Sequence, residues 1–178
     1  MIIVLNGYPG VGKLTIGRVL ADQLHGRLLD IHTVYNVAFA LTEFKSKLFK
    51  ETTRQIERIA HDLILQLPAD VPVVLTTVLT GDSDWATEEW ENLLTLGKAR
   101  PPFCVVHLRC DLDENIRRIK DPGRAAKRKP QEAEYAIRNH GNGAVLKGLD
   151  VPNLLRLDVT NRGADSAAEE IAGWARKL

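Results

Sequence analysis

The chain has 178 residues and a formal net charge of +1. This length is sufficient for one domain with a full core, and the near-neutral charge excludes the strong positive field of a typical nucleic-acid-binding domain. All apolar runs fall short of the roughly 20 residues that span a bilayer, and the first run ends at Asn6 without a basic segment before it, unlike a secretory signal. We expect a cytoplasmic protein whose two cysteines, Cys104 and Cys110, are buried or idle thiols.

Apolar stretches rich in β-branched residues alternate along the chain with stretches of helical periodicity. The predicted strands cover residues 2–5, 27–31, 71–79, 103–108 and 153–159. Three of them are apolar almost throughout, which is typical of strands that are buried on both faces. This alternation predicts right-handed crossovers and a parallel sheet that is covered by helices on both sides.

Helices are predicted between these strands from apolar stripes and capping patterns. The stretches 13–24 and 51–67 each have an apolar stripe at helical spacing. The second helix is expected to bury Ile56, Ile59, Leu63 and Leu67. The spacings of Asp111 to Glu114 and Ser166 to Glu169 are those of capping boxes, which predict helices over 112–120 and 167–177. The last helix is expected to bury Ile171, Trp174 and Leu178.

The first predicted strand runs directly into the stretch GYPGVGKLT, residues 7–15. This stretch fits the phosphate-binding pattern G-x-x-x-x-G-K-[ST] except at the last position, where Leu14 stands and Thr15 follows. The strand, the glycine-rich turn and the helix start occur in the order that the motif requires. The alternative is a structural glycine-rich turn with an idle lysine, Lys13.

The loop suits a bound phosphate for three reasons. Gly7, Gly10 and Gly12 permit positive φ angles and a close approach of the backbone to a ligand. The backbone amides of residues 11–15 are expected to point into the turn at a helix N-terminus, where free N–H groups and the helix dipole favour phosphate. Lys13 adds a full positive charge that can reach the outer phosphates.

The stretch GYPGVGKLT resembles the P-loop of adenylate kinases, G-x-P-G-x-G-K-G-T, and that of the wider group of small P-loop kinases. Those enzymes also lack a hydroxyl directly after the lysine and carry threonine one residue later. The resemblance implies a kinase that binds ATP, with Mg²⁺ held largely through waters, so we name no metal-ligating residue. Leu14 is then expected to contribute a backbone N–H and Thr15 its hydroxyl. The expected nucleotide-binding residues of the loop are Gly7, Gly10, Val11, Gly12, Lys13, Leu14 and Thr15.

Asp30 stands at the end of the second predicted strand, in the stretch LLDIHTVYN. Ligands of open parallel sheets bind at the carboxyl ends of strands, where an aspartate can accept the proton of an acceptor hydroxyl or orient that group. Shikimate, gluconate and chloramphenicol kinases, which this layout resembles, carry an aspartate at the corresponding place. The alternative is that Asp30 caps the next helix. His32 is a candidate for substrate contact or a surface histidine, and Tyr35 is a candidate for the wall of an acceptor pocket.

Seven basic residues and a single aspartate give the segment 117–130 a charge of +6. By its position this segment resembles the lid of small P-loop kinases, which we place at approximately 118–130. The resemblance implies that Arg118 lies against the adenine ring and that Arg124 and Arg128 contact phosphate. The alternatives are a solvated run of charges or a nucleic-acid-binding patch. The expected catalytic residues are Lys13, Asp30, Arg124 and Arg128.

Two further places bear on nucleotide and acceptor binding. After the last strand, where similar kinases hold the adenine, Thr160 and Asn161 are expected to flank the ring, although an ordinary strand-to-helix turn has the same composition. Arg54 and Arg58, one helical turn apart, are candidates for binding an anionic acceptor. The alternative is a solvated face on which they pair with Glu51 and Glu57.

One expected group is missing from the sequence. The third strand of such kinases is followed by an acid that holds magnesium water, and here Thr76 and Thr77 occupy its place. Asp82 and Asp84 lie farther along, where they either reach back to the site or cap the next helix.

Together these features predict one P-loop kinase domain over residues 1–178. Its fold is expected to be the three-layer α/β fold of P-loop NTPases, with a five-stranded parallel sheet in the order 2-3-1-4-5. The predicted function is ATP-dependent phosphorylation of a small hydroxyl-bearing metabolite, nucleoside or nucleotide, by a monomer or homodimer without membrane partners. The alternatives are a nucleotide-binding regulatory protein with little catalysis and a nucleic-acid end kinase.

Overall fold

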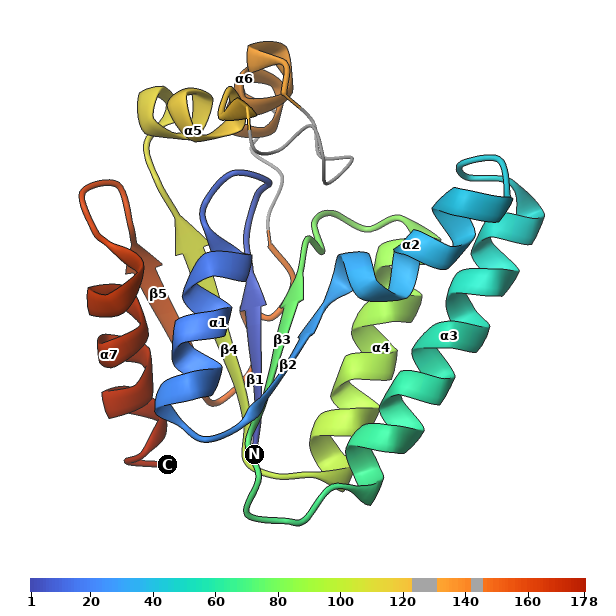
Figure 1. Ribbon diagram of the computed structural model, residues 1–178, viewed down its shortest axis with the longest axis vertical. Helices are drawn as coiled ribbons and strands as arrows, with labels where there is room; N and C mark the ends of the chain where they lie inside the picture. Colours follow the sequence, from blue (N-terminus) through green and yellow to red (C-terminus); the bar gives the residue numbers. More distant parts are fainter. Residues whose placement is uncertain (123–130, 142–145) are drawn as a thin grey trace.

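The computed structural model describes residues 1–122, 131–141 and 146–178, and its strands form one parallel sheet (Figure 1). The strands are β1 (Ile2–Asn6), β2 (Arg27–Asp30), β3 (Val73–Thr77), β4 (Phe103–Arg109) and β5 (Leu154–Asp158). Their order is β2-β3-β1-β4-β5, and each neighbouring pair is parallel. The predicted fold class and strand order are therefore confirmed.

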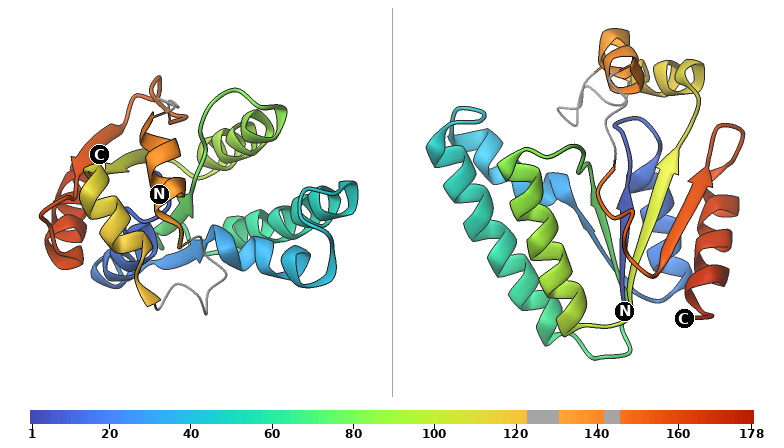
Figure 2. Two further views of the ribbon diagram at one scale, coloured as in Figure 1. Left: turned by 90° about the horizontal axis from the view of Figure 1, so that it is seen from above. Right: turned by 180° about the vertical axis from the view of Figure 1, so that it is seen from behind.

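Helices cover both faces of this sheet (Figures 1 and 2). They are α1 (Lys13–Gln23), α2 (Ile31–Leu41), α3 (Lys47–Gln66), α4 (Asp84–Ala99), α5 (Leu112–Ile119), α6 (Ala133–Gly141) and α7 (Ala164–Ala175). The helices α1 and α7 pack on one face, and α3 and α4 lie on the other. The short helices α5 and α6 lie beyond the carboxyl ends of the strands, over the loop that follows β1. None of the helices in the described ranges is long and apolar enough to cross a membrane.

The central strand β1 separates two apolar cores. Ile3 and Leu5 belong to the core beneath α1 and α7, whereas Ile2 and Val4 belong to the core beneath α3 and α4. All four side chains are fully buried, as expected for a strand that is covered on both faces. The two cysteine thiols are free and buried, and burial raises the pKa of each to about 11.

The inward face of α3 differs from the predicted one. Ile59 and Leu63 are 59% and 58% exposed, whereas Thr53 and Glu57 are buried. The reason is polar contact with α4, because Asn92 donates a hydrogen bond to Glu57 at 3.0 Å. Helix α3 therefore buries Thr53 and Glu57 together with Phe49 and Ile64, and of the predicted stripe Leu67 packs against the core.

The two predicted capping boxes have opposite outcomes. The carboxylate of Asp111 accepts a hydrogen bond from the backbone N–H of Glu114 at 2.7 Å and caps α5, but the N–H of Asp111 donates to Thr160 rather than to Glu114, so half of the predicted box forms. The cap at Ser166 is wrong, because α7 begins earlier, directly after Gly163, and has no side-chain cap. Leu178 lies beyond the end of this helix and is 50% exposed, so its predicted burial is also wrong. Helix α6 was not predicted.

Candidate active site

The loop between β1 and α1 has a backbone shape that glycine makes possible. A Cβ atom on Gly7 would lie 2.4 Å from the carbonyl oxygen of Leu108, so the loop passes close against β4. Gly10 and Gly12 have φ angles of 95° and 98°, in the left-handed region that side chains disfavour. The loop therefore leaves its strand closely packed and enters α1 through two positive-φ residues.

Lys13 is the first residue of α1, and its side chain folds back over this loop. Its Nζ atom donates hydrogen bonds to the carbonyl oxygens of Gly7 at 2.6 Å and Tyr8 at 3.0 Å. The helix begins after Gly12 without a side-chain cap and without an acidic residue in its first turn. Open backbone N–H groups and an ammonium group thus meet at one helix N-terminus, an arrangement that fits phosphate.

Leu14 and Thr15 differ in exposure. The side chain of Leu14 is half-buried, whereas Thr15 is exposed at the start of α1. The roles expected for the Leu14 amide and the Thr15 hydroxyl stay predictions.

Asp30 occupies the position before α2, but its side chain does not cap that helix. Instead the hydroxyl of Thr76 donates a hydrogen bond to the carboxylate of Asp30, and the backbone N–H of Ile31 donates to the oxygen of Thr76 at 3.4 Å. The alternative that Asp30 caps α2 is therefore wrong. Thr76, one of the two threonines that replace the expected acid, fixes the direction of the Asp30 carboxylate.

The acids after β3 do not fill the missing position. Thr77 is buried at the end of β3. Asp82 is exposed and forms an ion pair with Lys147 at 2.9 Å, and its reaching back to the site stays a prediction. Asp84 is exposed in the first turn of α4, which is capped by Ser83. Within the described ranges no three histidine, cysteine or acidic side chains are arranged to hold a metal ion.

Arg118, on α5, connects the phosphate loop to the end of β5. Its guanidinium group donates to the carbonyl oxygens of Val11 at 3.1 Å and Val159 at 2.7 Å, and it pairs with Glu114 at 2.6 Å. Hydrogen bonds from Arg117 and then Arg118 lower the pKa of Glu114 to about 2. The contact of Arg118 with adenine stays a prediction, since no nucleotide tests it.

The remaining predicted contacts have different outcomes. The hydroxyl of Thr160 accepts a hydrogen bond from the N–H of Asp111 at 2.9 Å and donates to Asp158 at 2.6 Å, so it stabilises the turn after β5. Asn161 is exposed beside it. Most of the predicted lid, with Arg124 and Arg128, lies outside the described residues.

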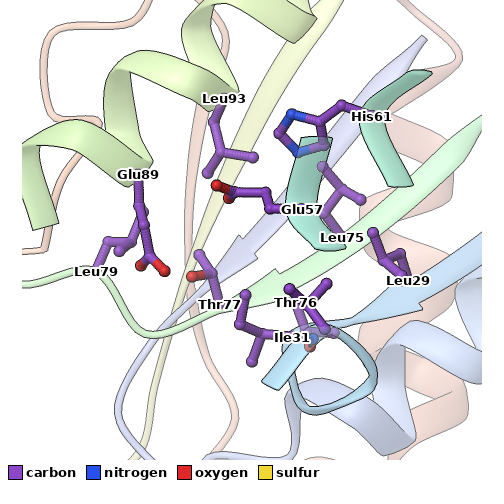
Figure 3. Close-up of a pocket in the computed structure, with 11 residues that line it drawn as sticks. Leu29, Ile31, Glu57, His61, Leu75, Thr76, Thr77, Leu79, Glu89 and Leu93 are labelled. Atoms are coloured by element: carbon purple, nitrogen blue, oxygen red, sulfur yellow. Dashed lines mark hydrogen bonds between the residues drawn. The ribbon is translucent and has the colours of Figure 1, made fainter. Parts of the chain in front are cut away.

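A buried acidic wall between α3 and α4 was missed by sequence analysis (Figure 3). The hydroxyl of Tyr35 donates a hydrogen bond to Glu89, and Trp85 donates to that hydroxyl at 3.4 Å. Burial raises the pKa of Glu89 to about 7, opposed by the Tyr35 hydrogen bond and assisted by Glu57. Burial also raises the pKa of Glu57. A glutamate within a charged helical stretch gives no sequence signal that it faces inward.

Arg54 and Arg58 do not bring positive charge to this wall. Arg54 donates two hydrogen bonds to Glu88, at 2.5 and 2.7 Å, and its guanidinium lies 5.4 Å from the ring centre of Trp85. Arg58 is exposed. The alternative that Arg54 pairs with Glu51 or Glu57 is therefore wrong, because its partner is Glu88 on α4.

Comparison with known proteins identifies the family. The sequence model of a family described as an AAA domain matches residues 3–139, and the chain belongs to this family. It is similar to a shikimate kinase from Caldanaerobacter subterraneus subsp. tengcongensis, with 25% identity over 173 residues that cover 95% of this chain and 92% of that protein.

Two solved structures share the fold of this chain. A gluconokinase from Sinorhizobium meliloti superposes with a TM-score of 0.62 and 14% identity, over 98% of this chain and 91% of that chain. A shikimate kinase from Acinetobacter baumannii in complex with shikimate superposes with a TM-score of 0.60 and 20% identity, over 99% of this chain and 93% of that chain. The predicted resemblance to the small P-loop kinase group is confirmed.

Proposed function

We propose that this member of the P-loop kinase group transfers the γ-phosphoryl group of ATP to a hydroxyl group of a small metabolite. One observation carries the proposal. The phosphate loop and Asp30 follow strands β1 and β2, which both pair with β3, so they lie at the same edge of the sheet. A phosphate site and a carboxylate that can take a proton are thus adjacent at the carboxyl ends of parallel strands.

The nucleotide would bind through the loop after β1. The backbone N–H groups at the start of α1 would donate to the phosphates, and Lys13 would exchange its carbonyl partners for phosphate oxygens. Arg118 lies beside the loop and beside the end of β5, which supports an adenine site between α5 and the turn at Thr160.

Magnesium bound with the nucleotide would neutralise charge on the transferring phosphoryl group. The oxygens that this chain offers fit a hydrated ion, which needs few protein ligands. The exposed hydroxyl of Thr15, at the start of α1, is the one placed beside the loop. Waters would complete the shell.

Transfer would begin when the acceptor hydroxyl gives its proton to the Asp30 carboxylate. The acceptor oxygen then forms a bond to the γ-phosphorus while the bond from this phosphorus to the bridging oxygen breaks. ADP leaves with the electron pair of that bond. Lys13 stabilises the charge that accumulates on the phosphate oxygens.

The nucleotide site is tested with Lys13→Ala. Calorimetry or steady-state kinetics should give a loss of nucleotide affinity or turnover of at least tenfold, about 1.4 kcal/mol. Arg18→Ala, an exposed substitution on the same helix, is the control and should change neither. Unchanged binding and turnover in Lys13→Ala would contradict the assignment.

The catalytic role of Asp30 is tested with Asp30→Asn, which retains the shape and removes the charge. Phosphoryl transfer should fall by about 10²–10⁴-fold, the range for loss of a general base, while ATP affinity stays within about threefold. Transfer that survives in this variant would show that another group takes the proton.

The missing acid after β3 favours one second candidate function. Thr76 and Thr77 hold that position, and Asp82 is engaged by Lys147. A nucleotide-binding regulatory protein with little catalysis would also carry the loop of residues 7–15. Tight ATP binding that depends on Lys13, without turnover across a broad screen of alcohols, would favour this second function.

A further inference from the structure

A concave space beside Asp30 lies between β3, α2, α3 and α4 (Figure 3). Its cavity volume is about 20 Å³, within an open concave region of about 370 Å³ that includes solvent. A cavity of this volume has room for about one water molecule, or for one hydroxyl or ammonium group of a larger ligand. Thr76 lines the space and donates a hydrogen bond to Asp30, so the space borders the proposed base.

Two buried carboxyl groups line this space from opposite helices. Glu57 of α3 is 7% exposed and Glu89 of α4 is 5% exposed. Hydrogen bonds from Asn92 and Tyr35 each occupy one oxygen, Oε2 of Glu57 and Oε1 of Glu89. A carboxylate has about four acceptor positions, so both groups retain capacity for a donor. No lysine or arginine in the described part of the chain pairs with either carboxyl group.

Thr77 supplies an independent observation. Its side chain lines the space and is 4% exposed. Figure 3 shows this side chain pointing into the region between β3 and α4, and its hydroxyl has no hydrogen-bond partner among residues 1–122, 131–141 and 146–178. A polar group of a ligand in the space can pair with this hydroxyl, which both donates and accepts hydrogen bonds.

The surroundings of the space disfavour an anion. Arg54, on α3, is held by two hydrogen bonds to Glu88, outside the lining residues. His61 lines the space, but burial lowers its pKa and keeps the ring neutral near pH 7. A carboxylate or phosphate group placed here would meet Glu57 and Glu89 without a compensating cation among the described lining residues.

We propose, building on the proposed function, that this space is the acceptor subsite and that it selects a hydroxylated acceptor without negative charge, a neutral polyol or an amino alcohol. A hydroxyl or ammonium group of the acceptor donates hydrogen bonds to Glu57 and Glu89 and contacts the hydroxyl of Thr77. A second hydroxyl of the same molecule faces Asp30. Shikimate and gluconate are hydroxylated carboxylates, so the acceptor of this chain belongs to a different charge class.

Three probes with one carbon skeleton test the charge selection: D-glucitol is neutral, D-glucamine is cationic and D-gluconate is anionic. At pH 8, above the pKa of about 7 at which Glu89 ionises, calorimetry in the presence of Mg²⁺ and ADP measures their binding, and ADP release from ATP measures transfer. Gluconate should be the weakest probe by at least tenfold in Kd or kcat/KM. Tighter binding of glucamine than of glucitol would identify an ammonium group as the favoured donor to the two carboxyl groups. Tighter binding of glucitol would identify a hydroxyl group as that donor.

The role of the acidic wall is tested with Glu89→Gln and, separately, Glu57→Gln, each checked for folding by thermal unfolding. Either change should reduce the ratio by which gluconate is weaker than glucitol, in Kd or kcat/KM, at least fivefold while ATP affinity stays the same. Glu91→Gln removes the same charge from the exposed side of α4 and should leave the selection unchanged.

Gluconate that binds as well as the other probes, absence of binding by all three, or selection unaffected by both variants would overturn the inference. The proposed function fails separately, if ATP binding is independent of Lys13 or if no alcohol is phosphorylated.

Discussion

Replacing Glu89 with glutamine is expected to change how the free energy of unfolding depends on pH. In the folded chain, burial is the main cause that raises the pKa of Glu89 from 4.5 to about 7. In the unfolded chain, the carboxyl group is hydrated and keeps its ordinary pKa. Glutamine preserves the volume and can still accept the hydrogen bond from Tyr35, but it does not ionise.

The sign follows from where the proton is held. Between pH 4.5 and about 7 the unfolded chain loses this proton while the folded chain retains it, so the free energy of unfolding falls as pH rises. The contribution is fully present below pH 4.5 and is lost above about pH 7. The difference between the two pKa values corresponds to about 3 kcal/mol, or about 6–12 °C in Tm for a chain of this size.

Urea unfolding of wild type and Glu89→Gln at pH 5 and at pH 8 measures this effect. The variant should gain about 2–3 kcal/mol relative to wild type between the two conditions. Glu91→Gln, which removes an exposed carboxylate from the same helix, should track the wild type. If the difference between Glu89→Gln and wild type is the same at both pH values, the carboxyl group of Glu89 ionises normally and the reasoning is refuted.

Substitutions at four further positions test other parts of the structure. Leu14→Ser should leave magnesium-dependent transfer within about threefold of the wild-type rate, whereas Thr15→Val should lower this rate at least tenfold. Measuring ADP release shows which of the two variants loses more activity, and a larger loss in Leu14→Ser would contradict the prediction. Gly7→Ala should lower the free energy of unfolding by about 1–3 kcal/mol, because its Cβ would lie 2.4 Å from the Leu108 carbonyl oxygen; an unchanged urea midpoint would argue against this close approach. Asp111→Ala should cost about 1 kcal/mol by loss of the α5 cap, whereas Asp111→Asn should cost little in the same denaturation assay.

The sheet and the phosphate loop were predictable because their signals are local. Apolar runs such as 2–5 and 103–108 are buried on both faces, and few structures other than a central strand accommodate them. The glycines of residues 7–15 follow directly from backbone conformations that other residues disfavour. The capping aspartate of α5, Asp111, acts within one helical turn, and it was also found.

The inward face of α3 was not predictable from periodicity. Two possible faces compete in this helix, one with Ile59 and Leu63 and one with Thr53 and Glu57. The outcome depends on α4, where Asn92 meets Glu57 across 35 positions of sequence. The orientation of Asp30 is another such case, since Thr76 lies on a different strand. Contacts of this kind depend on tertiary packing, for which one sequence contains no local signal.

The strand order also fixes a length. Both β1 and β2 pair with β3, so the phosphate loop and Asp30 start from strands that are two spacings, about 10 Å, apart. Backbone hydrogen bonds set this separation, whereas the side chains of Glu57 and Glu89 project from helices outside the sheet. Under the proposed function, changes on α3 and α4 would therefore alter the choice of acceptor without altering the separation between the loop after β1 and Asp30. Mutagenesis that aims at new acceptors is therefore best directed at α3 and α4.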